Sequence, residues 1–293
     1  MKSFHTLADL QAWRPLPDDA QEAIRLGVVG DPVAHSLSPS LQNAALTECG
    51  LALRYARFRI LPNELPAALR SFGELGFAGL NLTVPHKVAG FSLVHEMDSF
   101  ARQVGAINTI RFAKGKLSAA NTDGPGFERA IRESFGVELR DLRVLVLGAG
   151  GGAGQAVAAQ SALAGCPALT LVNRDFAKAQ TLARRWEAAH IAAVPWEADS
   201  LGEAIAQSDL IVHATPLGLL PNDPSPLPPA LLAARHLVYD LNYQPTPLLA
   251  AARAAGVRCA SGLTMLLHQG ALAFEFWFDQ PAPLAVMRRA LGL

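Results

Sequence analysis

Four short polar segments in the first half of the chain carry the side chains that could do chemistry. They supply hydroxyl, amide, ammonium and carboxylate groups with few aromatic neighbours. Each comes at the end of an apolar run, and α/β sheets hold their ligands at the carboxyl ends of strands. Such a lining suits a small polyhydroxylated acid, with serines and amides on its oxygens and an ammonium exchanging a proton. The segments are 30–39, 81–87, 105–109 and 121–126.

Alternation in the first two segments puts polar side chains on one side of an extended chain. Ser36 and Ser38 are two residues apart beside a proline, and Asn81 and Thr83 are spaced in the same way. Simpler interpretations exist, because Ser38 could cap a helix and Lys87, taken alone, is more often solvated surface. A helix cap leaves Ser36 unexplained. We therefore expect the paired side chains to contact a ligand.

A glycine-rich turn in the second half predicts a dinucleotide site. The apolar run 144–147 is typical of a strand buried on both faces, and Gly148-Ala-Gly-Gly-Gly-Ala-Gly154 follows it at once. An Ala-rich stretch comes next, and a second apolar run ends at Asn173 and Arg174. Glycines let backbone N–H groups approach a pyrophosphate, and a helix beginning there directs its positive end at that anion. Arg174 lies about twenty residues beyond Gly154, where a polar group should meet the adenosine ribose.

The elements that must position these groups alternate between strands and helices. This pattern predicts a mostly parallel α/β sheet. A hairpin with strands 106–112 and 116–120, joined through Lys114 and Gly115, is expected at one edge. The other expected strands are 26–29, 54–60, 79–83, 144–147, 169–172, 209–214, 237–241 and 257–259, and the expected helices include 38–49, 65–75, 99–104 and 262–278.

The composition disfavours several classes of protein. A chain of 293 residues, 51% hydrophobic and 17% charged, suits a globular enzyme of two domains. Lys plus Arg equals Asp plus Glu at 25 each, so no charge excess points to nucleic acid or an anionic membrane. Three widely separated cysteines suggest neither disulfides nor a metal site, and the N-terminus does not resemble a signal peptide. We expect a cytoplasmic protein that needs no metal.

The polar segments, in their order, resemble the motifs of shikimate dehydrogenases. The motifs similar to that family's substrate domain are His35-Ser-Leu-Ser-Pro39, Gly79-Leu-Asn-Leu-Thr-Val-Pro-His-Lys87, Gly105-Ala-Ile-Asn-Thr109 and Asn121-Thr-Asp-Gly-Pro-Gly126. The resemblance continues through the glycine turn, Asn173-Arg174, Tyr239-Asp-Leu-Asn-Tyr243-Gln-Pro-Thr-Pro247 and Gly262-Leu-Thr-Met-Leu-Leu-His-Gln269. It covers nearly all of residues 26–277.

The resemblance implies two α/β domains and one reaction. A substrate-binding domain with a mostly parallel sheet is expected at 1–122, completed by 263–293, and a Rossmann-like NAD(P)-binding domain at 123–262. The active site would lie in the cleft between them. The implied reaction is the reversible, NADPH-dependent reduction of 3-dehydroshikimate to shikimate. The partner would be that small molecule, and the protein would be a monomer or homodimer.

The family's site residues carry over onto the matching positions. Lys87 and Asp123 would be the catalytic pair, the ammonium donating a proton to the ketone oxygen and the carboxylate orienting it. Ser36 and Ser38 would hold the substrate carboxylate, and Tyr243 would line the cleft near the nicotinamide. Ring hydroxyls would be bound by Asn81, Thr83, Asn108 and Gln269. Cofactor contacts are expected from Gly148, Gly150, Gly151, Gly152, Ala153, Asn173, Arg174, Asp175, Lys178, Thr215 and Gly262.

The segment after Arg174 bears on the choice of cofactor. Family members that use NADP typically have Thr or Ser at this position, and this chain has Asp175. Arg174 and Lys178 favour a 2′-phosphate by charge, whereas Asp175 would repel it and could accept a bond from a free 2′-hydroxyl. Because the two cations outnumber the single carboxylate, we predict NADP as the cofactor, with NAD as the alternative. A second departure is His213, which stands where the family has Asn and which we interpret as a neutral, hydrogen-bonded side chain.

Three other functions stay open at this stage. A quinate or dual quinate/shikimate dehydrogenase is the nearest, although Ser38 stands where quinate users often carry Thr or Gly. An aminoshikimate-type paralogue is the second. The third is a non-catalytic NADP-binding sensor on the same fold, which would have no need of both Lys87 and Asp123.

Overall fold

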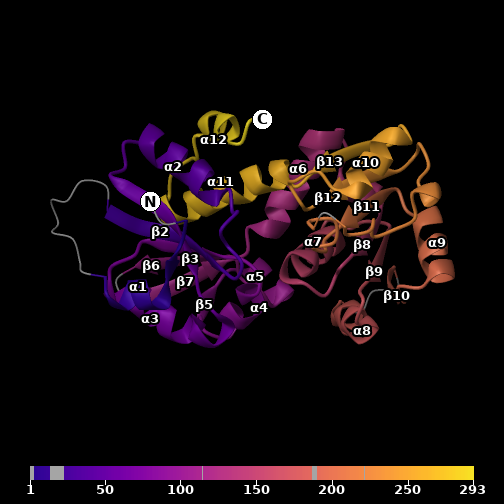
Figure 1. Ribbon diagram of the computed structural model, residues 1–293. Coiled ribbons are helices and arrows are strands. Elements are labelled where there is room, and N and C mark those ends of the chain that lie inside the picture. Colours follow the sequence, from indigo (N-terminus) through magenta and orange to yellow (C-terminus); the bar gives the residue numbers. More distant parts are fainter. Residues whose placement is uncertain (1–2, 14–22, 114, 187–189, 221) are drawn as a thin grey trace. The chain divides into compact units, whose positions relative to one another are not determined.

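The structure is a computed structural model that describes residues 3–13, 23–113, 115–186, 190–220 and 222–293 (Figure 1). The chain forms two compact units, Met1–Thr122 with Gln269–Leu293, and Asp123–His268. Helix α11 (Leu263–Phe278) begins in the second unit and continues into the first. The expected boundary at 263 is the first residue of this helix.

The first unit is built, within the described residues, on a seven-stranded sheet with the order β1-β3-β2-β4-β6-β7-β5. Strand β6 runs antiparallel to both of its neighbours, and the other neighbouring pairs are parallel. The strands are β1 (His5–Thr6), β2 (Ala23–Gly30), β3 (Leu53–Arg59), β4 (Gly79–Leu82), β5 (Glu96–Met97), β6 (Thr109–Ala113) and β7 (Lys116–Ala120).

The expected hairpin is present as β6 and β7, but it does not form the edge of the sheet. Strand β5 pairs with β7 on its outer side and takes that position. Two residues are too few for alternating hydrophobicity to be recognised, which is why the sequence did not indicate β5. Lys114, at the expected turn, lies outside the described residues.

One face of this sheet carries an aromatic cluster. The ring centroid of Phe58 in β3 lies 4.9 Å from that of Phe72 and 5.6 Å from that of Phe77, in edge-to-face geometry. Because side chains alternate along a strand, Tyr55 and Arg57 point to the opposite face. The helices of the unit besides α11 are α1 (Leu7–Gln11), α2 (Ser38–Glu48), α3 (Leu65–Glu74), α4 (His86–Phe91), α5 (Ser99–Val104) and α12 (Leu284–Ala290).

Helices α2 and α11 cover the opposite face and are tied to each other. Gln42 Nε2 in α2 donates to the carbonyl of Gly270 in α11 at 2.9 Å. The indole Nε1 of Trp277 in α11 donates to the carbonyl of Ile110 at 2.9 Å, and its ring lies directly over Gly79 of β4. A side chain at residue 79 would collide with this indole.

The second unit is built, as far as the structure describes it, on six parallel strands with the order β10-β9-β8-β11-β12-β13. Counted from β8 this is the 3-2-1-4-5-6 order of the doubly wound Rossmann fold, whose ligands bind where the order reverses. The reversal here lies between β8 and β11. The strands are β8 (Arg143–Leu147), β9 (Ala168–Val172), β10 (Ile191–Val194), β11 (Leu210–His213), β12 (Leu237–Asp240) and β13 (Arg258–Ser261).

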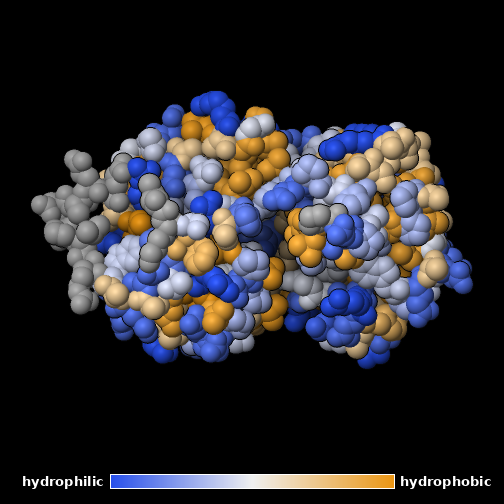
Figure 2. All heavy atoms as spheres, viewed as in Figure 1, coloured by the Kyte–Doolittle hydropathy of each residue, from blue (hydrophilic) through white to orange (hydrophobic). Residues whose placement is uncertain are grey.

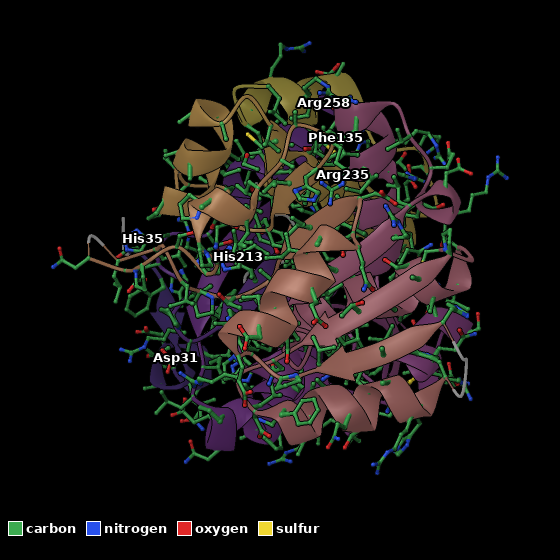
Figure 3. All side chains as sticks on the ribbon, turned by 90° about the vertical axis from the view of Figure 1, so that its right-hand side faces the viewer. Asp31, His35, Phe135, His213, Arg235 and Arg258 are labelled. Carbon is green, nitrogen blue, oxygen red and sulfur yellow. The ribbon has the colours of Figure 1, made fainter. Side chains whose placement is uncertain are left out.

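Helices pack on the sheet of this unit through small and apolar side chains. In α7, buried alanines and Val157 let the helix lie close to β8. Arg258 of β13 donates to the carbonyl of Phe135 at 2.6 Å and lies against its ring. Both residues are labelled in Figure 3. Hydrophilic residues gather over α8 in Figure 2, where Lys178 and Arg184 are exposed. The helices are α6 (Asp123–Phe135), α7 (Gly152–Leu163), α8 (Phe176–Arg185), α9 (Ala198–Ala206) and α10 (Pro247–Ala254).

The two sheets confirm the expected fold class of mostly parallel α/β architecture. Strands β2, β3, β4, β8, β9, β11, β12 and β13 match the expected runs within a few residues. Among the described residues, no helix is both long and apolar enough to cross a membrane.

The contact between Gly79 and Trp277 yields a stability prediction. A Cβ at residue 79 would lie 2.3 Å from Trp277 Nε1. We expect Gly79→Ala to lower the free energy of unfolding by about 1–3 kcal/mol, because the indole has to leave its bond to Ile110. Denaturant unfolding followed by circular dichroism measures this change.

Gly73→Ala in α3 is the matched control, since its Cβ would meet the Phe112 ring at an ordinary 3.7 Å. It should leave the free energy of unfolding unchanged or raise it by about 0.5–1 kcal/mol. Equal losses in the two variants would contradict the packing argument.

Candidate functional site

The two serines of the first motif lie at the start of α2. Ser38 is its first residue and is buried, and its backbone N–H donates to Ser36 Oγ at 3.3 Å. No side chain caps this helix. Arg57 of β3 donates from Nε and Nη2 to the carbonyl of Ser36, at 3.0 and 2.7 Å. The segment is therefore held both by its own hydrogen bond and by a guanidinium.

Asn81 lies at the end of β4 in a buried set of polar contacts. It accepts from the hydroxyl of Tyr55 at 2.7 Å, and its Nδ2 donates to the carbonyl of Asn108 at 3.2 Å and to Thr109 Oγ1 at 3.1 Å. Burial raises the pKa of Tyr55 well above its ordinary value, although a hydrogen bond with Ser38 and the charge of Arg57 lower it. The phenol thus stays protonated and links the serine motif to Asn81.

Asn108 is the centre of a second set of contacts. Its Oδ1 accepts from the backbone N–H of Thr122 at 2.8 Å and from Thr109 Oγ1 at 3.0 Å. Its Nδ2 donates to Thr122 Oγ1 at 2.9 Å and to Gln269 Oε1 at 3.5 Å. The first unit therefore brings together Ser38, Asn81, Asn108 and Gln269, which come from four separate motifs.

Lys87 and Thr83 flank a short turn between β4 and α4. Thr83 is half-buried, its backbone N–H donates to the carbonyl of Val29 at 2.9 Å, and its methyl group packs on Gly30. Lys87 is half-buried, and its carbonyl accepts from the backbone N–H of Ile107 at 3.0 Å. His86, between them, is fully buried and contacts the carbonyl of Ile60 through Nε2 at 2.7 Å. The backbone around Lys87 is therefore held by hydrogen bonds at Thr83 and at Lys87 itself.

Asp123 opens α6 at the start of the second unit and is 4% exposed. It follows Thr122, which is itself bound to Asn108. Its neighbour in the motif, Asn121, donates from Nδ2 to the carbonyl of Ala106 at 2.9 Å, and so shapes the loop. Aspartate side chains are seldom buried in proteins, and Asp123 is one that is.

The glycine turn after β8 is tightly folded. Gly148 has a φ of 92°, and a Cβ there would lie 2.6 Å from the methyl of Thr215. A Cβ on Gly154 would lie 2.3 Å from the carbonyl of Gly148. Gly150 donates its N–H to Asn173 Oδ1 at 3.1 Å. Helix α7 begins at Gly152 without a side-chain cap, so no side chain occupies its first N–H groups, and a helix start of this kind can bind an anion.

The predicted cofactor residues Gly151, Gly152 and Ala153 lie at or beside this helix start, with Gly151 exposed. Turn and helix together fit a pyrophosphate, because glycine leaves the backbone open to its approach.

Two exposed charged residues, Arg174 and Asp175, lie shortly after β9. Asn173 donates from Nδ2 to the carbonyl of Asp175 at 3.0 Å, which fixes the bend. Lys178 Nζ lies 3.8 Å from Asp175 Oδ2, one turn along α8. Arg174 is exposed beside them. The pairing of Asp175 with Lys178 reduces the repulsion that the carboxylate would exert on a phosphate.

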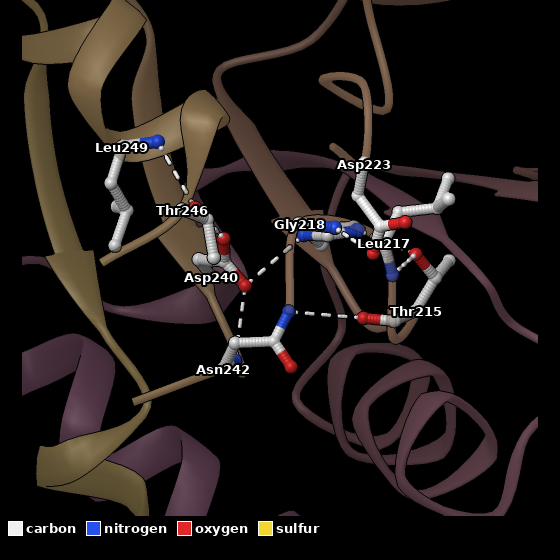
Figure 4. A network of polar contacts seen from close by, with 9 residues as sticks. Thr215, Leu217, Gly218, Asp223, Asp240, Asn242, Thr246 and Leu249 are labelled. Atoms are coloured by element: carbon white, nitrogen blue, oxygen red, sulfur yellow. Dashed lines mark hydrogen bonds and ion pairs between the residues drawn. The ribbon is translucent and has the colours of Figure 1, made fainter. Parts of the chain in front are cut away.

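A buried polar network joins the ends of β11 and β12 (Figure 4). His213 Nδ1 lies 3.1 Å from Asp240 Oδ1, and both side chains are fully buried. Asp240 also accepts from the backbone N–H of Asn242 at 3.0 Å and from Thr246 Oγ1 at 2.6 Å. His213, labelled in Figure 3, is hydrogen-bonded through Nε2 to Thr215 Oγ1, as expected from the sequence, whereas Nδ1 lies near Asp240 without forming a hydrogen bond to it.

The same network fixes Thr215, a predicted cofactor residue. Its hydroxyl contacts His213 Nε2 and accepts from the backbone N–H of Leu217 at 3.1 Å. Its carbonyl accepts from Asn242 Nδ2 at 3.0 Å. Because the methyl of Thr215 packs on Gly148, the network also fixes a residue that packs against the glycine turn.

Gly262 and Tyr243 complete the predicted set in the second unit. A Cβ on Gly262 would lie 2.0 Å from the carbonyl of Leu241, so only glycine fits, and its N–H donates to the carbonyl of Asn242 at 3.1 Å. Tyr243 is half-buried in the loop after β12. Within the described residues, no group of three His, Cys, Asp or Glu side chains could hold a metal ion.

Two residues of the first unit contact the predicted site but were not predicted. Tyr55 bridges Asn81 and Ser38, and Arg57 holds Ser36. Both lie in a strand that the sequence indicated, and their spacing of two residues places them on one face. Alternation of polar residues within that strand was the available signal.

Models of known protein families match three successive parts of the chain. Residues 28–110 match the shikimate dehydrogenase substrate binding domain, and residues 129–217 match shikimate / quinate 5-dehydrogenase. Residues 262–291 match the shikimate 5′-dehydrogenase C-terminal domain. The matches follow the chain in order and together cover more than half of it.

Individual proteins are similar over nearly the whole chain. The shikimate dehydrogenase (NADP(+)) of Methanopyrus kandleri is 41% identical over 274 residues, which cover 91% of this chain and 94% of that protein. The crystal structure of shikimate dehydrogenase from Aquifex aeolicus superposes with a TM-score of 0.86 at 34% identity, covering 94% of this chain and 99% of that one. The enzyme from Thermus thermophilus, solved with NADP(H) and shikimate, has a TM-score of 0.82 at 36% identity, with 92% and 98% covered.

The network around His213 yields a prediction. We expect His213→Leu to lower the free energy of unfolding by about 3 kcal/mol, because it leaves Asp240 buried with one polar partner fewer. His213→Asn keeps a polar group at this position and should lower the free energy of unfolding by less than His213→Leu does. Urea unfolding measures both, with His95→Leu, at an exposed position, as the control. A leucine variant as stable as the wild type would contradict the pairing.

Proposed function

This chain belongs to the shikimate dehydrogenase family, and we propose on that premise that it catalyses the reversible NADPH-dependent reduction of 3-dehydroshikimate to shikimate. Two observations support the proposal. The buried contacts of the first unit join side chains from the family's separate motifs, and the curated relatives are named NADP(+)-dependent shikimate dehydrogenases.

The first unit supplies groups suited to the substrate. We assign the carboxylate of the substrate to Ser36 and Ser38 at the start of α2, where hydroxyl groups and the helix end favour an anion. We assign the ring hydroxyls to a set of amides and a hydroxyl that can donate and accept, Asn81, Thr83, Asn108 and Gln269. The mutual hydrogen bonds of these side chains support this, because they hold the donors in place before the substrate arrives.

Lys87 and Asp123 are assigned the proton transfer. When bound, NADPH supplies the hydride for the ketone carbon. The Lys87 ammonium stabilises the negative charge that develops on the ketone oxygen and donates the proton, and the Asp123 carboxylate orients the ammonium. In the reverse direction the neutral amine of Lys87 accepts the proton of the hydroxyl. Lys87 belongs to the first unit, and Asp123 is the first residue of the second.

The second unit supplies groups suited to NADP. The turn Gly148 to Ala153 and the start of α7 would hold the pyrophosphate, with Thr215 and Gly262 shaping the walls. Arg174 and Lys178 would hold the 2′-phosphate, and Asn173 orders the bend that presents them. Tyr243 would line the nicotinamide end. NAD as the preferred cofactor is not favoured by the relatives, which are named for NADP(+).

We further propose a cytoplasmic protein that acts as a monomer or homodimer and has no nucleic-acid partner. The balanced charge of the chain supports the last point. Quinate or dual specificity and a non-catalytic sensor are not favoured, because the relatives carry the shikimate name and the chain retains Lys87 and Asp123.

Initial rates test the proposed function. Shikimate and quinate are each paired with NADP⁺ and NAD⁺, and the absorbance of the reduced nicotinamide is followed. We expect a strong preference for shikimate with NADP⁺. Comparable rates with quinate and NAD⁺ would indicate a quinate or dual quinate/shikimate dehydrogenase. No turnover with any pair would favour the non-catalytic NADP-binding sensor.

The role of Lys87 is tested by substitution. We expect Lys87→Ala to lower kcat by about 10³-fold, because the proton donor is removed, while the Kd for NADP⁺ stays unchanged. Lys116→Ala is the control, since Lys116 is exposed and pairs with Glu96. Unchanged turnover in the Lys87 variant would refute its assignment.

The cofactor assignment is tested in α8 and the preceding bend. We expect Arg174→Ala to raise the KM for NADP⁺ by about tenfold or more, with little effect on NAD⁺, because a charged contact to the 2′-phosphate is lost. Asp175→Asn should lower the KM for NADP⁺ by removing a repulsive charge. Arg184→Ala, exposed in the last turn of α8, is the control. Equal losses with both cofactors would contradict a 2′-phosphate contact.

A further inference from the structure

Strand β3 presents two polar side chains to the serine motif. Tyr55 and Arg57 are two residues apart and share the face that α2 covers, away from the aromatic cluster around Phe58. Tyr55 contacts Ser38, and Arg57 contacts Ser36. Strand β3 therefore contacts both serines of the motif through these two side chains.

The bond between Arg57 and Ser36 is geometrically specific. Two nitrogens of one guanidinium, Nε and Nη2, converge on a single carbonyl oxygen at 3.0 and 2.7 Å. A planar fork can do this, whereas the ammonium of a lysine has no such fixed geometry. Arg57 is half-buried, so its charge is less screened than that of a fully exposed side chain.

The charge of this contact matters because the proposed ligand of the serines is an anion. Ser36 and Ser38 are neutral, and hydroxyl groups alone leave the charge of a bound carboxylate uncompensated. A partly buried carboxylate is stabilised by a cation close to it. Arg57 is a cation whose contact with the serine segment is direct. The next residue on the same face, Arg59, instead pairs with Asp31 and is more exposed.

We propose that Arg57 is a positioning residue that makes this site selective for a carboxylate, by fixing the backbone of Ser36 and placing a positive charge behind the serine pair. This inference rests on the proposed function, in that it takes Ser36 and Ser38 as the carboxylate site. It adds a residue that acts through Ser36 and determines which form of the substrate is accepted.

Comparing an acid with its neutral ester tests the inference. Shikimate and its methyl ester share the ring and its hydroxyls and differ in the charge. Arg57→Met keeps an unbranched apolar stem, and Arg57→Lys keeps the charge but not the fork. Arg59→Met, on the same strand, is the matched control. For each variant, KM and kcat with NADP⁺, the Kd of both ligands by calorimetry and the denaturant midpoint are measured.

We expect Arg57→Met to raise the KM and Kd for shikimate by about tenfold or more, with kcat nearly unchanged. The Kd for the methyl ester should change much less. The ratio of the two Kd values, which measures the preference for the acid over the ester, should therefore approach one. Arg57→Lys should restore part of that preference, and Arg59→Met should keep it. The Kd for NADP⁺ and the denaturant midpoint should stay near wild-type values.

Other outcomes overturn the inference. If Arg57→Met weakens the binding of the acid and of the ester equally, Arg57 only supports the fold. If the variant keeps the wild-type preference for the acid, the charge of Arg57 does not act on the substrate. If the wild type binds shikimate but does not turn it over, the proposed reaction fails while the calorimetry still decides the role of Arg57. If the wild type neither binds nor converts shikimate, both proposals fail.

Discussion

Polar groups that are buried at the ends of strands have to be paired with one another, and this requirement organises both units. An unpaired buried donor or acceptor costs about 1–3 kcal/mol, so each of these side chains is held by its neighbours. In the first unit Asn108 contacts Thr122, Thr109 and Gln269. In the second unit Asp240 binds Thr246 and Asn242 and lies beside His213. Three residues proposed to bind ligands, Asn108, Gln269 and Thr215, therefore each contact a polar neighbour.

Close backbone packing is the second constraint, and it acts where glycines stand. At Gly148, Gly154 and Gly262 an added Cβ would lie within 2.6 Å of a neighbouring atom. These positions keep the segments after β8 and β12 closely packed, and no side chain caps the start of α7, where an anion can bind. The network around His213 contributes to the same packing through Thr215. Side-chain pairing and backbone packing thus shape one region of the Rossmann-like unit.

Much of this architecture could be predicted from the sequence. Buried parallel strands read as continuous apolar runs, and β8 and β9 were found in this way. Strand β5, with two residues, and β10, with three partly buried residues and one exposed residue, carry too little hydrophobic contrast to be recognised. Among the site residues, Asn81 and Thr83 were indicated by alternation. Tyr55 and Arg57 were not, because their roles depend on contacts with residues distant in sequence.

The sequence by itself determined the fold class, the glycine turn and the family, because apolar periodicity, glycine spacing and ordered motifs are local properties of a chain. Only the tertiary structure decided which polar residues contact each other. The link from Tyr55 to Asn81 spans 26 residues, and the one from Asn108 to Gln269 spans 161. Such contacts arise from the order of strands in a sheet and from the return of α11 to the first unit. Hydrogen bonding between distant segments depends on that arrangement, and no local pattern records it.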